Sequence, residues 1–212
     1  MTRFLELYGQ RIVQASATHL MYVVVSVAAA FVVALALGIL LSRVPRWAGV
    51  ALPVVSVFQT VPGIVFIGLL FLVLGMVPLT VVIALGIYAV FPILKNTYTG
   101  ILEVEDRYKE AAKGCGMSPL QVLAKVELPL ALPAIISGLR MATVYTVSWA
   151  VLASMIGLGG LGDLIYAGVS SNNNTLILAG ALPAAAMALV LSAAIDLLHR
   201  ALIPKGLRRD AT

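Results

Sequence analysis

Long apolar runs constrain the fold of this 212-residue chain more than any other feature. A run of about 18 or more apolar residues is long enough to cross a membrane as an α-helix, whereas a β-barrel needs short segments of alternating hydropathy. The sequence has no such alternating segments, and its long apolar runs cover residues 20–41, 49–74, 77–94, 134–156 and 176–198. It therefore predicts an all-α, polytopic membrane protein with about five transmembrane helices.

The composition excludes several other classes of protein. Only 11% of the residues are charged and the mean hydropathy is +1.06, so a soluble core would lack its polar shell. Cys115 is the single cysteine, and the two histidines, His19 and His199, stand near opposite ends of the chain. Their spacing suits neither a disulfide framework nor a metal or catalytic site. Basic patches with aromatic or groove-fitting elements are lacking too, so we expect no enzymatic activity, no bound metal and no nucleic-acid partner.

Positive charge is distributed unequally between the predicted connectors. The first connector joins the first and second apolar runs, and the third connector joins the third and fourth. Except for Arg3 and Arg11, the 14 Lys and Arg residues lie in or next to one of these two connectors or in the C-terminal tail. Because cytoplasmic connectors are enriched in Lys and Arg, this pattern places the N-terminus outside and the C-terminus in the cytoplasm. We expect an interfacial segment at residues 1–19, a transmembrane domain at 20–203 and a cytoplasmic tail at 204–212.

A polar stretch at residues 103–129 interrupts the apolar runs on the predicted cytoplasmic side. Acidic residues begin a predicted helix over 104–113, which suits the positive end of a helix dipole. Gly114 and Gly116 permit a sharp turn, and Ser118-Pro119 has the residues preferred at a helix start. A second helix is predicted over 119–127, ending near Leu128-Pro129. The stretch thus predicts a compact helix–turn–helix that projects from the membrane.

The same stretch resembles the signature of ABC-importer permeases: Glu-Ala-Ala, three residues, Gly, nine residues, an aliphatic residue, one residue and Leu-Pro. The matching positions are Glu110, Ala111, Ala112, Gly116, Val126, Leu128 and Pro129, with Gly114 in the intervening turn. The resemblance implies a type I ABC importer fold like that of methionine permeases, and a coupling helix that docks on a cytoplasmic ABC ATPase subunit. It also implies that ATP and Mg²⁺ bind to that partner, and this chain has no G-x-x-x-x-G-K-[ST] motif of its own.

Other stretches narrow the resemblance to bacterial permeases of the glycine betaine, carnitine and choline osmoprotectant group. They are SVFQTVP at 56–62, FPILKNTYTGI at 91–101, ISGLRMA at 136–142 and MIGLGGLGDLIYAG at 155–168. The resemblance implies a second permease subunit, identical or homologous, and an extracellular substrate-binding protein as partners in the cell membrane.

Two alternatives stay open from the sequence. Permeases for methionine or other amino acids share the architecture and parts of these stretches. The alternative from another class is a secondary transporter driven by an ion gradient. Such a transporter usually needs ionisable residues within its spans or an inverted repeat. The apolar runs contain no acidic residue before Asp196, and we detect no repeat.

Polar and aromatic residues within the predicted spans are candidates for the substrate pathway. They are Ser56, Gln59 and Thr60 in the second span, Tyr88 in the third, and Tyr145 and Trp149 in the fourth. The first three share one helical face with Gly63, at the spacing i, i+3, i+4 and i+7. Aromatic faces attract quaternary ammonium cations, which suits a betaine or choline substrate. Hydrogen bonding between packed helices is the other interpretation of these polar groups.

Overall fold

The structure is a computed structural model that describes the backbone of residues 2–202 and the side chains of residues 8–154 and 157–201. Its elements in chain order are α1 (Thr2–Arg43), α2 (Pro45–Thr60), α3 (Gly63–Leu74), α4 (Pro78–Leu102), α5 (Asp106–Gly114), α6 (Pro119–Val122), the π-helix η1 (Leu123–Glu127), α7 (Leu128–Ala153), the π-helix η2 (Ser154–Leu158), α8 (Leu161–Ser170) and α9 (Asn174–Leu202). The described residues contain no strand, which confirms the all-α prediction.

Four stretches of helix are long and apolar enough to cross a membrane: 8–43, 78–102, 119–153 and 174–201. The helices α2 and α3 pass the same test only as a pair, and they are bent by 97° at their junction. Counting this pair as one span gives five, in agreement with the prediction. The second predicted span is nevertheless broken rather than continuous. Pro62 explains the break, because it lacks an N–H and disfavours the helical conformation at Val61, whose ψ is 127°.

The N-terminal prediction differs from the structure. We expected residues 1–19 to form a separate interfacial segment, but α1 runs unbroken from Thr2 to Arg43. The first proline of the chain is Pro45, so no residue up to that point excludes the helical conformation. His19 is buried, and its Nε2 lies 3.1 Å from the Val147 carbonyl oxygen of α7. Position 19 therefore belongs to the helix bundle. The predicted tail at 204–212 lies outside the described residues.

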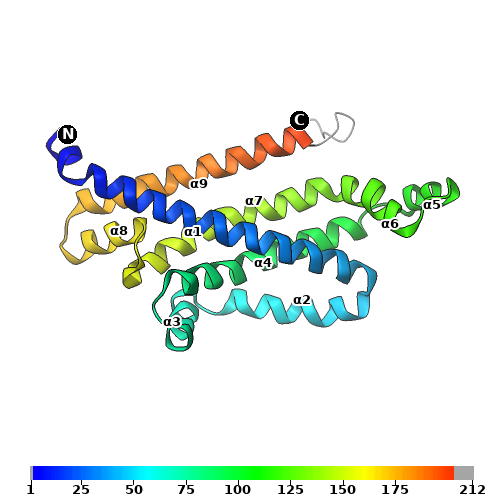
Figure 1. Cartoon of the computed structure of the whole chain (residues 1–212), viewed down its shortest axis with the longest axis horizontal. Helices are drawn as coiled ribbons and strands as arrows, with labels where there is room; N and C mark the ends of the chain where they lie inside the picture. Colours follow the sequence, from blue (N-terminus) through cyan, green and yellow to red (C-terminus); the bar gives the residue numbers. More distant parts are fainter. Residues whose placement is uncertain (1, 203–212) are drawn as a thin grey trace.

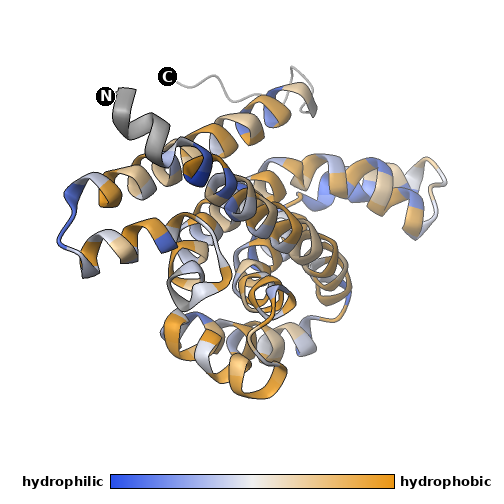
Figure 2. Cartoon of the chain, turned by 60° about the vertical axis from the view of Figure 1, so that its left-hand side comes forward, coloured by the Kyte–Doolittle hydropathy of each residue, from blue (hydrophilic) through white to orange (hydrophobic). Residues whose placement is uncertain are grey.

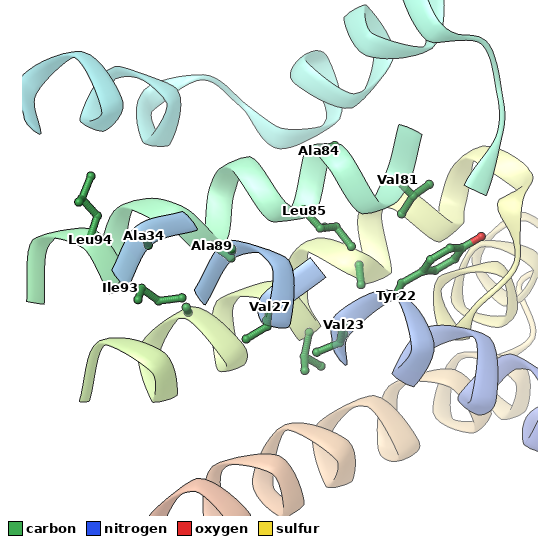
Figure 3. Packing of buried hydrophobic residues seen from close by; sticks show 14 of the residues in the cluster. Tyr22, Val23, Val27, Ala34, Val81, Ala84, Leu85, Ala89, Ile93 and Leu94 are labelled. Atoms are coloured by element: carbon green, nitrogen blue, oxygen red, sulfur yellow. The ribbon is translucent and has the colours of Figure 1, made fainter. Parts of the chain in front are cut away.

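Helices α1, α4 and α7 form the centre of the bundle, with α9 against α7 and α8, and with α2 and α3 against α4 (Figure 1). Fully buried side chains such as Val23 and Ala34 of α1 and Leu85 of α4 fill this centre (Figure 3). Small residues let the helices approach closely, as is common in membranes. At Gly138 of α7, a Cβ atom would lie only 2.8 Å from the Pro92 carbonyl oxygen of α4.

The outer surface of the bundle is strongly apolar, and hydrophilic residues gather on α5 and α6 and near the N-terminal end of α1 (Figure 2). Leu72 and Val73 of α3, for example, are 83% and 80% exposed. A large apolar surface of this kind suits contact with lipid rather than water.

The two ends of the molecule differ. Helices α5 and α6 project at the end where α1 and α9 finish, whereas α8 and the N-terminus lie at the opposite end (Figure 1). In the middle of α7, Arg140 donates a hydrogen bond to Ser192 Oγ of α9 at 2.8 Å and lies 3.3 Å from the Asp196 carboxylate. These contacts join α7 to the C-terminal half of α9.

Candidate functional site

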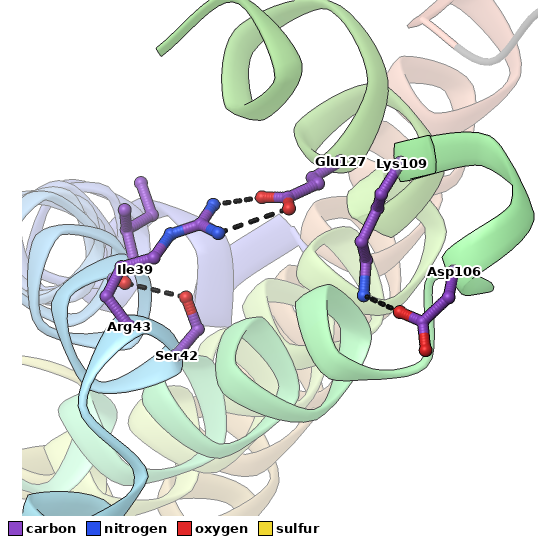
Figure 4. Close-up of polar contacts among 6 residues, drawn as sticks. All are labelled: Ile39, Ser42, Arg43, Asp106, Lys109 and Glu127. Carbon is purple, nitrogen blue, oxygen red and sulfur yellow. Dashed lines mark hydrogen bonds and ion pairs between the residues drawn. The ribbon is translucent and has the colours of Figure 1, made fainter. Parts of the chain in front are cut away.

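The projecting polar element starts with α5, which begins at Asp106 rather than at the predicted position 104 and has the expected acidic residue in its first turn. Asp106 occupies the first turn of α5, and its carboxylate lies 3.1 Å from Lys109 Nζ (Figure 4). Arg107 Nε lies 2.7 Å from the Glu105 carboxylate, and that carboxylate raises the pKa of the Arg107 guanidinium. In each of these ion pairs at least one of the two side chains is exposed to solvent, so the pairs add little to the stability of the protein. The exposed charges of α5 suit an aqueous environment.

The turn after α5 depends on one glycine rather than two. Gly116 has a φ of +80°, whereas Gly114 is the last residue of the helix. The Met117 N–H donates to the Ala112 carbonyl at 3.1 Å and the Gly116 N–H donates to the Lys113 carbonyl at 2.9 Å, which is the Schellman pattern of a helix C-terminus. The prediction that both glycines form the turn is therefore correct only for Gly116.

The start of the next helix agrees with the prediction. Ser118 is the N-cap of α6, its Oγ accepts a hydrogen bond from the Gln121 N–H, and its own N–H donates to Gln121 Oε1. Pro119 occupies the first helical turn. This reciprocal capping box fixes the direction in which the chain leaves the turn.

The end of that helix does not agree with the prediction. We expected it to stop near Leu128-Pro129, but α6 continues through η1 into α7 as one helical run over 119–153. Pro129 lacks an N–H and would disturb an ordinary α-helix. The π-helix absorbs the disturbance, since the Leu128 N–H donates to the Leu123 carbonyl, five residues back. The second helix of the polar element is consequently a direct extension of α7, which is part of a candidate membrane span.

The residues of the permease signature divide into an exposed group and a packed group. The exposed group comprises Glu110, Ala111, Gly114 and Gly116. Ala112 is buried, and Val126, Leu128 and Pro129 are partly buried, with Leu128 packed against the cluster of Ile101, Val104, Ala131 and Ile135. Leu120 of α6, which the signature does not specify, is 74% exposed. The exposed group lies on the surface of the polar element, and the packed group joins that surface to the bundle.

A second connection joins this element to α1. Glu127, the last residue of η1, is 3% exposed and forms a two-pronged ion pair with the guanidinium of Arg43 at the end of α1 (Figure 4). The signature leaves the position of Glu127 unspecified, so the sequence pattern alone did not predict a role for this residue. A charged residue between two apolar signature positions was the signal available in the sequence.

Among the candidate pathway residues, the structure brings Gln59, Tyr88 and Trp149 together next to the α2–α3 break. The Tyr88 and Trp149 rings are stacked with centroids 4.7 Å apart. Gln59 Nε2 donates to the Tyr88 carbonyl at 2.8 Å, and the Tyr88 hydroxyl donates to the Val61 carbonyl at 2.7 Å. These bonds satisfy backbone groups around the break, as a membrane interior requires. Phe66 of α3 completes the aromatic cluster at 5.3 Å from Tyr88.

The predicted continuous face of the second span is wrong, because the break ends it at Thr60. Ser56 and Thr60 donate to carbonyl groups of their own helix, each at 2.7 Å. Gly63 belongs to α3, where a Cβ atom would lie 1.8 Å from the Trp149 ring. Its role in the structure is to let that indole approach the backbone closely.

A cavity of about 450 Å³ lies next to this cluster. Its lining residues come from α2, α4 and α7 and are Gln59, Phe91, Pro92, Lys95, Asn96, Thr99, Met141 and Tyr145. Two of the candidate pathway residues, Gln59 and Tyr145, thus border the cavity, while Tyr88 and Trp149 stack beside it. Within the described part of the chain, no group of three or more His, Cys, Asp or Glu residues could hold a metal ion.

The bundle, its projecting polar element and its cavity describe a subunit of a membrane transporter, and comparison with known proteins specifies the family. Residues 26–207 match the model of the binding-protein-dependent transport system inner membrane component. The chain therefore belongs to this family of ABC-importer permeases.

Curated relatives match over nearly the whole chain. The choline transport system permease protein OpuBB of Bacillus subtilis (strain 168) is 37% identical over 207 residues, which cover 98% of this chain and 95% of that protein. The glycine betaine/carnitine/choline transport system permease protein OpuCD of the same organism is 41% identical over 197 residues, covering 92% and 86%.

Solved structures confirm the type I importer fold. An inward-facing structure of the MetNI methionine ABC transporter matches with a TM-score of 0.82 and 22% identity, covering 94% of this chain and 99% of that chain. An amino acid ABC transporter crystallised with histidines matches with a TM-score of 0.70 and 19% identity, covering 92% and 93%. At these identities the likeness concerns the fold alone.

Proposed function

We propose that this permease imports a small quaternary ammonium osmoprotectant and receives the energy of ATP hydrolysis through α5 and α6. In this proposal a cytoplasmic ABC ATPase subunit binds ATP and Mg²⁺ and docks on the surface around Glu110 and Ala111. A second permease subunit completes the pathway, and an extracellular binding protein delivers the substrate at the end that carries α8. The N-terminus is then outside and the C-terminus in the cytoplasm.

The observation that supports the coupling proposal is the continuous helical path from α6 through η1 into α7, with α5 joined to it by the turn at Gly116. The exposed part of the signature lies on α5 and the turn after it, and the packed part continues through η1 into α7 as one helical run. The Arg43–Glu127 ion pair ties the same element to α1. A displacement imposed at Glu110 would therefore move α1 and α7 together, which is what coupling to a substrate pathway requires.

The substrate proposal is supported by the relatives and by the aromatic residues of the bundle. Proteins at 37% and 41% identity are named as permeases for choline or for glycine betaine, carnitine and choline. Methionine transport is the second candidate, but its support is a likeness of fold at 22% identity, which does not extend to substrate. Membership in a binding-protein-dependent family argues against the ion-gradient alternative.

The test is uptake by the complete transporter, purified in mild detergent with its ATPase, its second permease subunit and its binding protein, and reconstituted in liposomes. We expect ATP-dependent uptake of radiolabelled glycine betaine, carnitine or choline, and none of methionine. Glu110→Lys is expected to abolish uptake while the subunit remains inserted, since it reverses an exposed charge at the docking surface. The matched control is Glu103→Lys, which reverses an exposed charge outside the signature. Uptake that survives Glu110→Lys, or that needs no ATP, would overturn the coupling proposal.

A further inference from the structure

Lys95 occupies an unusual place in α4. It is the single charged residue of this 25-residue helix. The sequence placed it at the start of the third connector, but α4 continues to Leu102, seven residues or about 10 Å farther along the helix axis. Lys95 therefore belongs to a candidate membrane span and not to a loop. An ionisable residue within a span is costly and commonly functional.

Lys95 has no carboxylate within ion-pair distance among the described residues, and its Nζ lies over the Phe91 ring, 6.0 Å from the ring centroid. Two other basic residues of the bundle helices do have acidic partners, since Arg43 pairs with Glu127 and Arg140 pairs with Asp196. The positive charge of Lys95 is thus available to a ligand.

Lys95 also lines the cavity of about 450 Å³ between α2, α4 and α7, a volume within the usual range for small-molecule sites. Among the lining residues Lys95 carries the only charge, Gln59 and Asn96 contribute amides, and Phe91 and Tyr145 contribute aromatic rings. Tyr145 is 49% exposed and is one of the residues that line the cavity. The cavity therefore offers a cation for an anionic group and an aromatic ring for a quaternary ammonium group.

We propose that Lys95 binds the carboxylate of a zwitterionic trimethylammonium substrate in this cavity, and that Tyr145 contacts its ammonium group. This inference rests on the proposed function, because it assigns a substrate subsite within the proposed pathway. It also gives the subsite a preference. Glycine betaine and carnitine carry the required carboxylate, whereas choline carries only a positive charge, which Lys95 repels.

The experiment compares maximal uptake rates of glycine betaine, carnitine and choline by the complete reconstituted transporter at saturating binding protein, so that differences in delivery do not enter. Lys95→Gln is expected to lower the rates for the two zwitterions about tenfold or more relative to choline, the factor expected for a lost hydrogen bond between charged groups. Lys95→Arg, which keeps the charge, is expected to retain the wild-type ratio. Lys95→Met provides a second neutral variant if the glutamine variant does not assemble.

Arg46→Gln is the matched control, because it removes an exposed positive charge at the start of α2, away from the cavity lining. It is expected to leave the zwitterion-to-choline ratio unchanged. A parallel loss of all three rates in Lys95→Gln would overturn the inference, as would a wild-type protein that carries choline but neither zwitterion. Both results leave ATP-driven osmoprotectant import intact. A wild-type transporter that takes up none of the three compounds would instead remove the proposed function, and this inference with it.

Discussion

Replacing Arg43 by methionine tests the connection between α1 and the polar element. The change leaves the Glu127 carboxylate, whose side chain is 4% exposed, without its partner. Breaking a buried ion pair costs about 3–5 kcal/mol, and since the Arg43 side chain is itself 43% exposed, solvent screening reduces our expectation to about 2–3 kcal/mol. For a chain of this size, that loss corresponds to a melting temperature about 5–10 °C lower.

The assay is thermal unfolding of the purified subunit in detergent, with Arg107→Met as the matched control. Arg107 and Glu105 are 68% and 58% exposed, so the loss of that pair is expected to leave the melting temperature close to that of the wild type. Adding Glu127→Leu to Arg43→Met removes the unpaired carboxylate, and the double variant is expected to recover most of the lost stability. An Arg43→Met variant that is no less stable than Arg107→Met would contradict this prediction, as would a double variant that is less stable than Arg43→Met alone.

Two further predictions use pairs of glycines in the same element or turn. Gly63→Ala places a Cβ atom 1.8 Å from the Trp149 ring and is expected to destabilise the protein by about 1–3 kcal/mol, measured by thermal unfolding and by a shift in Trp fluorescence. Gly68→Ala in the same helix meets no atom within 4 Å and is expected to be neutral or slightly stabilising; equal effects of the two changes would contradict the close contact. Gly116→Ala forces a side chain into a φ of +80° and is expected to cost about 1–2 kcal/mol. Gly114 has helical backbone and open space where a Cβ atom would lie, so Gly114→Ala is expected to retain wild-type stability. A loss of stability in Gly114→Ala as large as that in Gly116→Ala would contradict a turn that depends on Gly116 alone.

The polar element was foreseen in part because its capping residues act locally. Ser118, Pro119 and Gly116 occupy the positions that the sequence assigned to them, since an N-cap, a first-turn proline and a left-handed glycine depend on the nearest backbone groups. The continuation of α6 into α7 was not foreseen. A proline in a sequence indicates a break, and whether a π-turn absorbs it depends on the packing of the flanking helix against the rest of the bundle.

The arrangement of the candidate pathway residues could likewise not be predicted from the sequence. Their polar and aromatic types were evident, but the 97° bend at Pro62 decided that Gln59, Tyr88 and Trp149 meet while Ser56 and Thr60 bond to their own helix. Lys95 was assigned to a connector because a charge ends an apolar run in the sequence. Its place inside α4, next to a cavity, depends on where α2 and α7 pack.

By itself, the sequence determined that the chain is a helical membrane protein and a member of the permease family, because apolar length and a spaced signature are properties of the chain alone. Tertiary structure alone decided which residues share a cavity, which buried carboxylate meets Arg43, and how the polar element joins α7. These depend on contacts between residues far apart in sequence, such as Arg43 with Glu127, and such contacts form only when helices pack in three dimensions.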